Sequence, residues 1–158
     1  MPKACYAGGV SVQRDPAKLK AKLLEFAKDF PFFNLVGFEV LDCDAGYSKC
    51  QIRLRPELHN PNGVLHGGVL ATLIDAGITQ AMLMTDEYQV IRDTKGAMST
   101  VDLHIKYLRP ISSGLAICES RVVHLGKRIV HAQSKVQNEA GKDLALGDAS
   151  MILVPGSP

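Results

Sequence analysis

Hydrophobic residues recur at helical spacing near the start of the chain. Between Asp15 and Pro31 they lie about three or four positions apart, as on one face of a helix: Leu19, Leu23, Phe26, Ala27 and Phe30. Asp15 followed by Pro16 is a typical helix start, and Pro31 ends the run. The pattern predicts a short amphipathic helix near the N-terminus.

The following segment changes from strand-like to helical spacing. Residues from Phe33 to about Leu54 fit two strands joined at the turn-forming triplet 44–46, and Pro56 opens a polar loop. A long helix is then expected from about Gly68 to Thr85. Apolar residues occupy nearly every side of that helix, which is typical of a central helix: Val69, Leu70, Leu73, Ile74, Ile78, Ala81, Met82, Leu83 and Met84.

After the long helix the spacing of apolar residues falls to two, the period of a half-buried strand. In residues 97–107 the apolar set is Ala97, Val101, Leu103, Ile105 and Tyr107, alternating with Thr100, Asp102, His104 and Lys106. Three more strand-like runs follow near 114–125, 128–139 and 143–154. Two strands, one buried helix and four strands predict an α+β fold, with an antiparallel sheet curled around the helix.

Composition and charge exclude several classes of function. The net charge is +2 and the basic residues form no long run, so nucleic acid is not an expected partner. No segment reaches about 18 uninterrupted apolar residues, and the first ten residues lack a signal-peptide core. We therefore expect a cytoplasmic protein without a membrane span.

The cysteines indicate neither a metal site nor a redox site. Cys5, Cys43, Cys50 and Cys118 form no C-x-x-C pair and have no partnered histidine spacing. No metal is expected, and reduced thiols are the default. One alternative is that Cys43 and Cys50 face each other across the first hairpin.

The clearest chemical feature is His66-Gly67-Gly68 followed by Asp75. Two glycines at a helix start let a ligand approach the backbone, and the first N–H groups of a helix are partly positive and lack intrahelical partners. Asp75 stands among apolar residues, where a carboxylate is costly unless it is paired or used. The residues predict an oxyanion site and a functional acid, while the simpler alternatives are a helix cap at His66 and a structural hydrogen bond at Asp75.

Three groups of residues, in order, resemble the hotdog-fold thioesterases, including the PaaI-type enzymes and the mammalian small acyl-CoA thioesterases. They are the loop His59-Asn60-x-x-Gly63-x-Leu65-His66-Gly67-Gly68, the acid Asp75, and the strand Thr100-Val101-Asp102-Leu103-x-Ile105-x-Tyr107-Leu108-x-Pro110. The similarity covers roughly residues 33–154. It implies a hotdog thioesterase domain at 33–158, preceded by an extension and short helix at 1–32.

The resemblance also implies roles for five residues. The Gly67 N–H would bind the carbonyl oxygen of a thioester, and Asp75 would activate water or attack the carbonyl itself. Asn60 and His66 would order the loop and the carbonyl, and the Thr100 hydroxyl would help to hold the water. Coenzyme A would be part of the substrate, so no cofactor is expected.

Five further residues are candidates for binding the substrate. Thr79 follows Asp75 by one helical turn and offers a second hydroxyl on the same face, and Gly68 adjoins the oxyanion amide. Arg109, Lys127 and Arg128 could receive the phosphates of coenzyme A. The preferred acyl group stays open among aryl, hydroxyaryl and medium-chain aliphatic groups.

Helix phase separates the two halves of the proposed site. Nine residues at about 100° and 1.5 Å each place His66 and Asp75 roughly on opposite sides and about 13 Å apart along the axis. A two-fold dimer would set the helix start of one subunit beside Asp75 of the other, and the resemblance implies such composite sites. We therefore expect a homodimer with shared sites, assembled further as a dimer of dimers.

Two other functions compete with thioester hydrolysis. A hotdog dehydratase or hydratase has a related fold with a differently placed histidine and acid, and a non-catalytic acyl-CoA-binding module has the same fold without turnover. A serine hydrolase is not indicated, since the chain has no G-x-S-x-G motif. Asp75 favours turnover over binding alone.

Overall fold

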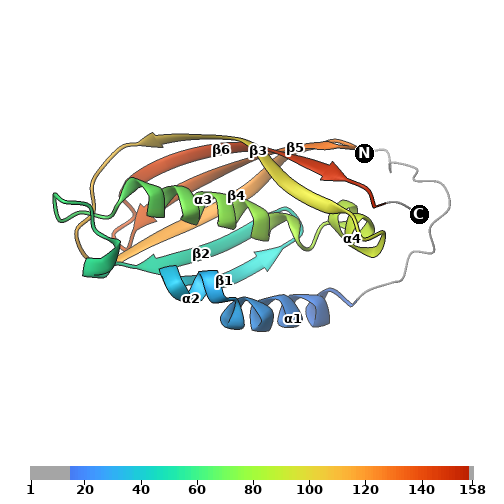
Figure 1. Cartoon of the computed structure of the whole chain (residues 1–158), viewed down its shortest axis with the longest axis horizontal. Helices are drawn as coiled ribbons and strands as arrows, with labels where there is room; N and C mark the ends of the chain where they lie inside the picture. The colour runs from blue at the N-terminus through green and yellow to red at the C-terminus, as the bar shows by residue number, and fades with distance from the viewer. Residues whose placement is uncertain (1–14, 157–158) are drawn as a thin grey trace.

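A computed structural model of the chain, in which residues 15–156 are described, shows a curled sheet with a helix inside it (Figure 1). In chain order the elements are α1 (Pro16–Asp29), α2 (Pro31–Val36), β1 (Phe38–Asp44), β2 (Tyr47–Arg53), the 3-10 helix η1 (Pro56–Leu58), α3 (Gly67–Met82), α4 (Asp86–Asp93), β3 (Ala97–Tyr107), β4 (Leu115–Leu125), β5 (Ile129–Asn138) and β6 (Asp143–Val154).

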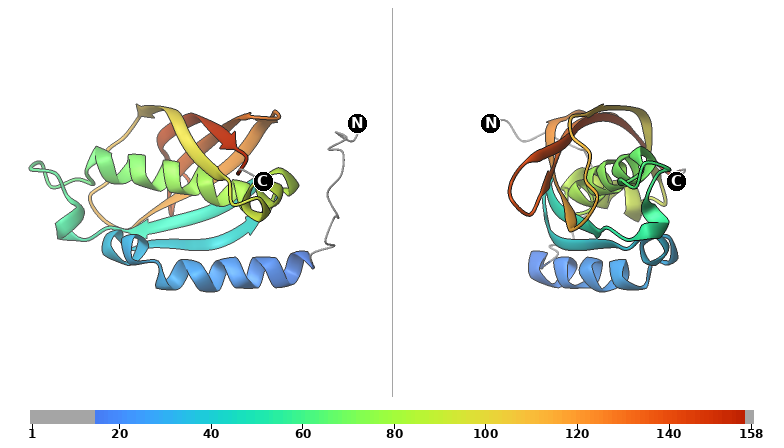
Figure 2. Two further views of the ribbon diagram at one scale, coloured as in Figure 1. Left: turned by 45° about the vertical axis from the view of Figure 1, so that its right-hand side comes forward. Right: turned by 90° about the vertical axis from the view of Figure 1, so that its left-hand side faces the viewer.

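The six strands form one antiparallel sheet in the order β1-β2-β4-β5-β6-β3. The sheet curves around α3, as the end-on view in Figure 2 shows, and α1 lies outside it against β1. The side chains of Leu73, Ile74 and Ile78 on α3 are completely buried, which agrees with a central helix. The predicted α+β hotdog fold is confirmed.

The N-terminal helix is confirmed, but the residues after it are not a strand. Asp15 caps α1 by accepting the Ala17 N–H at 3.0 Å, and the helix ends before Phe30. Pro31 then occupies the first position of α2, where its missing N–H costs nothing. Phe33 is therefore helical, and the first strand begins at Phe38, after Gly37 ends α2 with a φ of 71°.

The long helix ends earlier than predicted, because a second helix starts at a sharp bend. Thr85 caps α4 by accepting the Tyr88 N–H at 3.3 Å, and Asp86 and Glu87 lie in its first turn, where the helix dipole favours acids. Within residues 15–156, no single helix is long and apolar enough to cross a membrane; α3 and α4 reach that length only as a pair, with an 85° bend between them.

Strand β3 contains an irregularity that the sequence pattern does not reveal. Its register with β6 shifts between Thr100 and Asp102, so the alternation of inner and outer residues changes phase. Val101 is 58% exposed and Tyr107 is 55% exposed, so the regular alternation expected of a half-buried strand does not hold along β3. Thr100 instead contacts α3, and β3 pairs with β6 alone, which leaves its other edge open.

Helix α3 packs tightly against the sheet at Gly77. A Cβ atom on Gly77 would lie 2.8 Å from Ser120 Oγ and 3.4 Å from Cys118 Sγ. The Ser48 hydroxyl donates to the Gly77 carbonyl at 2.7 Å, and Ser120 shares a 2.7 Å hydrogen bond with Ser134. This contact fixes the depth of α3, and with it the position of Asp75 two residues earlier.

We expect Gly77→Ala to lower the free energy of unfolding by about 1–3 kcal/mol, because the added methyl group overpacks the contact with Ser120. Denaturant unfolding of the single and double variants measures the effect. Combining it with Ser120→Ala removes the atom that is struck, so the double variant should lose less stability than the two single variants summed. Strict additivity would contradict a steric cause.

Candidate active site

Asp75 lies in the third turn of α3, half-buried, beside the irregularity in β3. The Thr100 hydroxyl donates a hydrogen bond of 2.7 Å to its Oδ1. Its Oδ2 accepts no hydrogen bond from the residues that the structure describes. The partner is thus another side chain from the predicted site, not a loop backbone, and one carboxylate oxygen is free to act.

The start of α3 presents one free amide. His66 caps the helix, since its Nδ1 accepts the Gly68 N–H at 2.9 Å. A neutral ring that accepts at Nδ1 carries its proton on Nε2, which makes the outer nitrogen a donor. The Gly67 N–H has no acceptor among residues 15–156, as expected for the first position of a helix. This amide is the group that can bind an oxyanion.

Asn60 organises the loop that leads into α3. Its Oδ1 accepts the N–H groups of Asn62 at 2.9 Å and Val64 at 3.4 Å, and its own N–H donates to the Val64 carbonyl at 2.8 Å. The His66 N–H donates to the Leu58 carbonyl at 2.9 Å. Asn60 therefore shapes the approach to the helix start through backbone contacts.

Tyr107 is a neighbour of the site that sequence reasoning missed. Its hydroxyl donates to the Gly67 carbonyl at 3.2 Å, and a Cβ atom on Gly67 would lie 3.4 Å from its ring. The sequence pattern placed Tyr107 only in the apolar set of its strand. The only sequence signal was its place at the end of the strand motif, directly before Leu108.

The remaining candidates on α3 lie close to these groups. Thr79 is half-buried one turn beyond Asp75, and its hydroxyl has no hydrogen-bond partner in the described part of the chain. Gly68 is exposed, and its N–H is already taken by His66. Thr79 can therefore contact a ligand through its hydroxyl. Gly68 has neither a side chain nor a free N–H, so it can only leave room for a ligand.

The structure does not bring the three predicted phosphate ligands together. The Arg109 N–H donates to the carbonyl of Leu144, whereas the Arg128 carbonyl accepts from the N–H of Leu153. These two contacts lie at opposite ends of β6, about 30 Å apart at the rise of a strand. Lys127 adjoins Arg128 in the β4–β5 turn, and both are exposed. One subunit thus has two separate groups of these cationic residues, Arg109 at one end of β6 and Lys127 with Arg128 at the other.

The free amide and the carboxylate are also separated within one chain. α3 continues without a break from Gly67 to Met82, so Gly67 and Asp75 lie about 12 Å apart along its axis. A thioester carbonyl is a single small group. It cannot meet both residues of one helix at this separation.

The three described cysteines are unsuited to nucleophilic chemistry, whereas Cys5 lies outside the described residues. Cys43, Cys50 and Cys118 are free and buried. Burial raises the pKa of the Cys118 thiol to about 11 and that of Cys50 further still, so both stay protonated near neutral pH. Cys43 lies opposite Ser48 on β2, and Cys50 lies opposite Cys118 on β4, so the alternative that Cys43 and Cys50 face each other was wrong. Among the described residues, no three acidic, His or Cys side chains could hold a metal.

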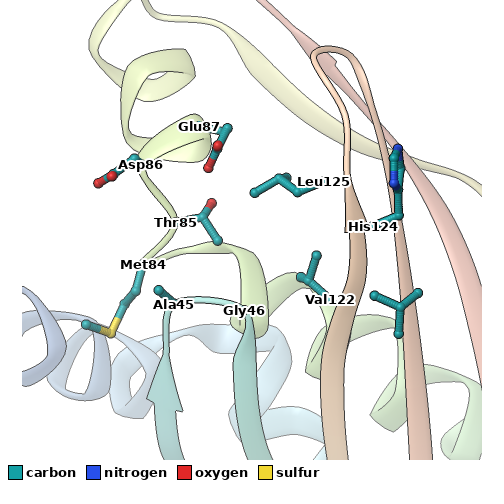
Figure 3. A pocket seen from close by; sticks show the side chains of 10 residues that line it. Ala45, Gly46, Met84, Thr85, Asp86, Glu87, Val122, His124 and Leu125 are labelled. Atoms are coloured by element: carbon teal, nitrogen blue, oxygen red, sulfur yellow. The ribbon is translucent and has the colours of Figure 1, made fainter. Parts of the chain in front are cut away.

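A cavity of about 410 Å³ lies at the other end of α3 (Figure 3). It is bounded by the β1–β2 turn, β4 and the start of α4, and its lining includes Met84, Val122 and His124. The cavity contains none of the predicted site residues. The buried Thr85 hydroxyl in its lining donates to the Met82 carbonyl and accepts the Tyr88 N–H, so its proton is already engaged.

Known proteins are similar to this chain in sequence and in fold. Proofreading thioesterase EntH of Klebsiella pneumoniae is 32% identical over 100 residues, which are 63% of this chain and 68% of that protein. Human acyl-coenzyme A thioesterase 13 is 34% identical over 100 residues, which are 62% of this chain and 66% of that protein, slightly under two thirds of its length.

The structural comparison agrees. The E. coli PaaI protein from the phenylacetic acid degradation operon superimposes with a TM-score of 0.75, covering 90% of this chain and 97% of that one, and at 19% identity the likeness concerns the fold alone. The sequence profile of the Thioesterase superfamily matches residues 62–145, more than half of the chain, and this range contains Gly67, Asp75 and Thr100. The chain therefore belongs to the thioesterase superfamily.

Proposed function

We propose that the protein hydrolyses acyl-CoA thioesters to the free acid and coenzyme A. The observation that carries this proposal is the pairing of Asp75 with Thr100 at 2.7 Å, which leaves Oδ2 free. The unpaired Gly67 N–H at the start of α3 supplies the second requirement, a donor for an oxyanion.

In the proposed reaction the carbonyl oxygen of the thioester accepts the Gly67 N–H. Asp75 either takes a proton from water while the water oxygen bonds to the carbonyl carbon, or attacks that carbon itself. In both routes the tetrahedral oxyanion collapses, the carbon–sulfur bond breaks, and coenzyme A leaves as a thiolate. The first route gives the free acid directly, and the proton on Asp75 passes to the thiolate; the second gives an anhydride, which water cleaves to the free acid and the Asp75 carboxylate. A thiolate leaves without a strong general acid, so His66 is not required to donate a proton. Its role is to cap the start of α3.

We infer that the site is shared between two subunits. About 12 Å separates Gly67 from Asp75 in one chain, so a two-fold partner has to bring its own helix start to Asp75. The face of α3 with Asp75 and Thr79 is only half-buried, and the neighbouring β3 has an open edge, which leaves room for such a partner. A dimer of dimers and a cytoplasmic location remain expectations of the same proposal.

Substrate contacts follow from this arrangement. The acyl group would run from Asp75 along the face that carries Ala76, Thr79 and Leu83, which suits aryl and medium-chain groups. Arg109 of one subunit, or Lys127 and Arg128 of the other, would receive the phosphates of coenzyme A. No cofactor is needed. The name of one relative, acyl-coenzyme A thioesterase 13, supports an acyl-CoA substrate, and that of the other, proofreading thioesterase EntH, supports thioester hydrolysis.

Release of free thiol from a panel of aryl-, hydroxyaryl- and aliphatic acyl-CoA esters tests the proposal. We expect turnover of at least one ester, with kcat at least about a hundredfold lower in the Asp75→Asn variant. Crotonyl-CoA in the panel separates the alternatives, since hydration without thiol release would indicate a hydratase. Tight binding of every ester without turnover would indicate a binding module and overturn the proposal.

Thr100 provides a prediction about the orientation of Asp75. Thr100→Val keeps the shape but removes the hydroxyl that donates to Oδ1, so we expect kcat to fall roughly tenfold, the worth of one hydrogen bond to a charged group. Thr100→Ser retains the donor and should stay within about threefold of the wild type. Equal activity of the Val and Ser variants would remove Thr100 from the site.

A further inference from the structure

Tyr107 contacts the start of α3 in two ways. Its hydroxyl donates to the Gly67 carbonyl at 3.2 Å, and its ring edge occupies the space beside the Gly67 Cα, where a Cβ atom would lie 3.4 Å from Cε1 and Cζ. Tyr107 is the last residue of the edge strand β3 and is 55% exposed. Burial in the core therefore does not account for its position.

The first turn of α3 needs such support. It begins with two consecutive glycines, which have the widest backbone freedom of any residue, and helix ends fray. His66 holds the Gly68 N–H, and Tyr107 holds the Gly67 carbonyl. Both contacts act on the peptide unit that joins Gly67 to Gly68, which directly follows the free Gly67 N–H. They therefore restrict the direction of that N–H through the Gly67 Cα.

We propose that Tyr107 is a positioning residue that fixes the direction of the Gly67 amide. This inference rests on the proposed oxyanion role of Gly67. An oxyanion donor accelerates a reaction because it already points at the developing charge, and removing one donor outright costs about 10²–10³ in kcat. Loosening the donor loses part of that factor. The loss falls on kcat, since the oxyanion exists only in the transition state.

The test compares Tyr107→Phe, which removes only the hydroxyl, with Tyr107→Leu, which also removes the ring. We expect Tyr107→Phe to lower kcat about 3- to 10-fold with KM within about twofold, and Tyr107→Leu to lower kcat further. Tyr47→Phe is the matched control, because Tyr47 lies on β2 with its ring against Arg121, away from the start of α3. This control should keep wild-type kcat.

Hydrogen exchange supplies a readout that does not depend on catalysis. The amides of Gly68, Val69 and Leu70 all bond to His66, so they should exchange faster when Tyr107 no longer holds this turn. Faster exchange together with a lower kcat supports the proposal. Unchanged exchange in both Tyr107 variants, or a kcat within twofold of the wild type, overturns it.

The outcome for Tyr107 is separable from the proposed function. If Asp75→Asn abolishes turnover while Tyr107→Phe and Tyr107→Leu leave kcat intact, thioester hydrolysis stands and the positioning role is overturned. If Asp75→Asn also leaves turnover intact, the proposed mechanism fails as well, and Tyr107 then positions nothing in the reaction.

Discussion

Asp75→Asn should lower kcat at least about a hundredfold with KM little changed, because the amide keeps the shape of the carboxylate but cannot accept a proton at neutral pH. Thr100 holds one carboxylate oxygen of Asp75, and the other oxygen is free to accept a proton. This arrangement suits a catalytic base. Steady-state thiol release from the best acyl-CoA ester measures the effect.

A matched control for this variant lies on the neighbouring strand. Asp102→Asn makes the same change on β3, where the carboxylate is exposed and lies 3.3 Å from His104. It should stay within about twofold of wild-type kcat. Similar losses in the two variants would mean that charge or stability, not the chemistry of Asp75, controls turnover. Wild-type activity of Asp75→Asn would move the chemistry to another group.

Residue spacing was sufficient for most of the fold, because the elements that encode it are strongly periodic. The buried helix α3 and the strands on both sides of it follow from apolar spacing alone. The errors lie where a local signal competes with periodicity. Pro31 both ends one helix and starts another, and the Thr85-Asp86-Glu87 cap begins α4 where the predicted helix ends, in a segment to which residue spacing assigned no element.

The sequence predicted which residues belong to the candidate site, but not which of them contact one another. His66, Gly67 and Asp75 are conspicuous because glycines and an acid stand where apolar residues are expected. The contact of Thr100 with Asp75 depends on the irregularity in β3, which turns Thr100 inward against the alternation. Tyr107 reaches Gly67 across 40 positions of sequence, and no local pattern encodes such a pair.

Gly67→Val tests the oxyanion half of the proposed site, which is the Gly67 N–H. The new side chain would press on the ring of Tyr107, already at contact distance from a Cβ atom, and would displace the first turn of α3. We expect this variant to lose activity while remaining a folded oligomer, as judged by circular dichroism and size-exclusion chromatography. It then serves as the amide-defective partner of Asp75→Asn.

Co-expression of Gly67→Val and Asp75→Asn chains should restore activity that neither variant has alone. If each site takes the amide from one subunit and the acid from the other, a mixed dimer holds one site with both defects and one intact site. Random assembly makes about half of the dimers mixed, so thiol release should reach roughly a quarter of the wild-type rate. Sites built within single chains would give no recovery.

The reverse pairing makes this test two-sided. When wild-type chains assemble at random with chains that carry both Gly67→Val and Asp75→Asn, shared sites leave every mixed dimer inactive, so only wild-type dimers work and activity is again about a quarter. Sites within single chains would instead give about half. The shared-site arrangement therefore requires about a quarter from both mixtures, and zero from the first with half from the second would contradict it. This pattern depends on the roughly 12 Å between Gly67 and Asp75 along α3, because only a second subunit can close that distance.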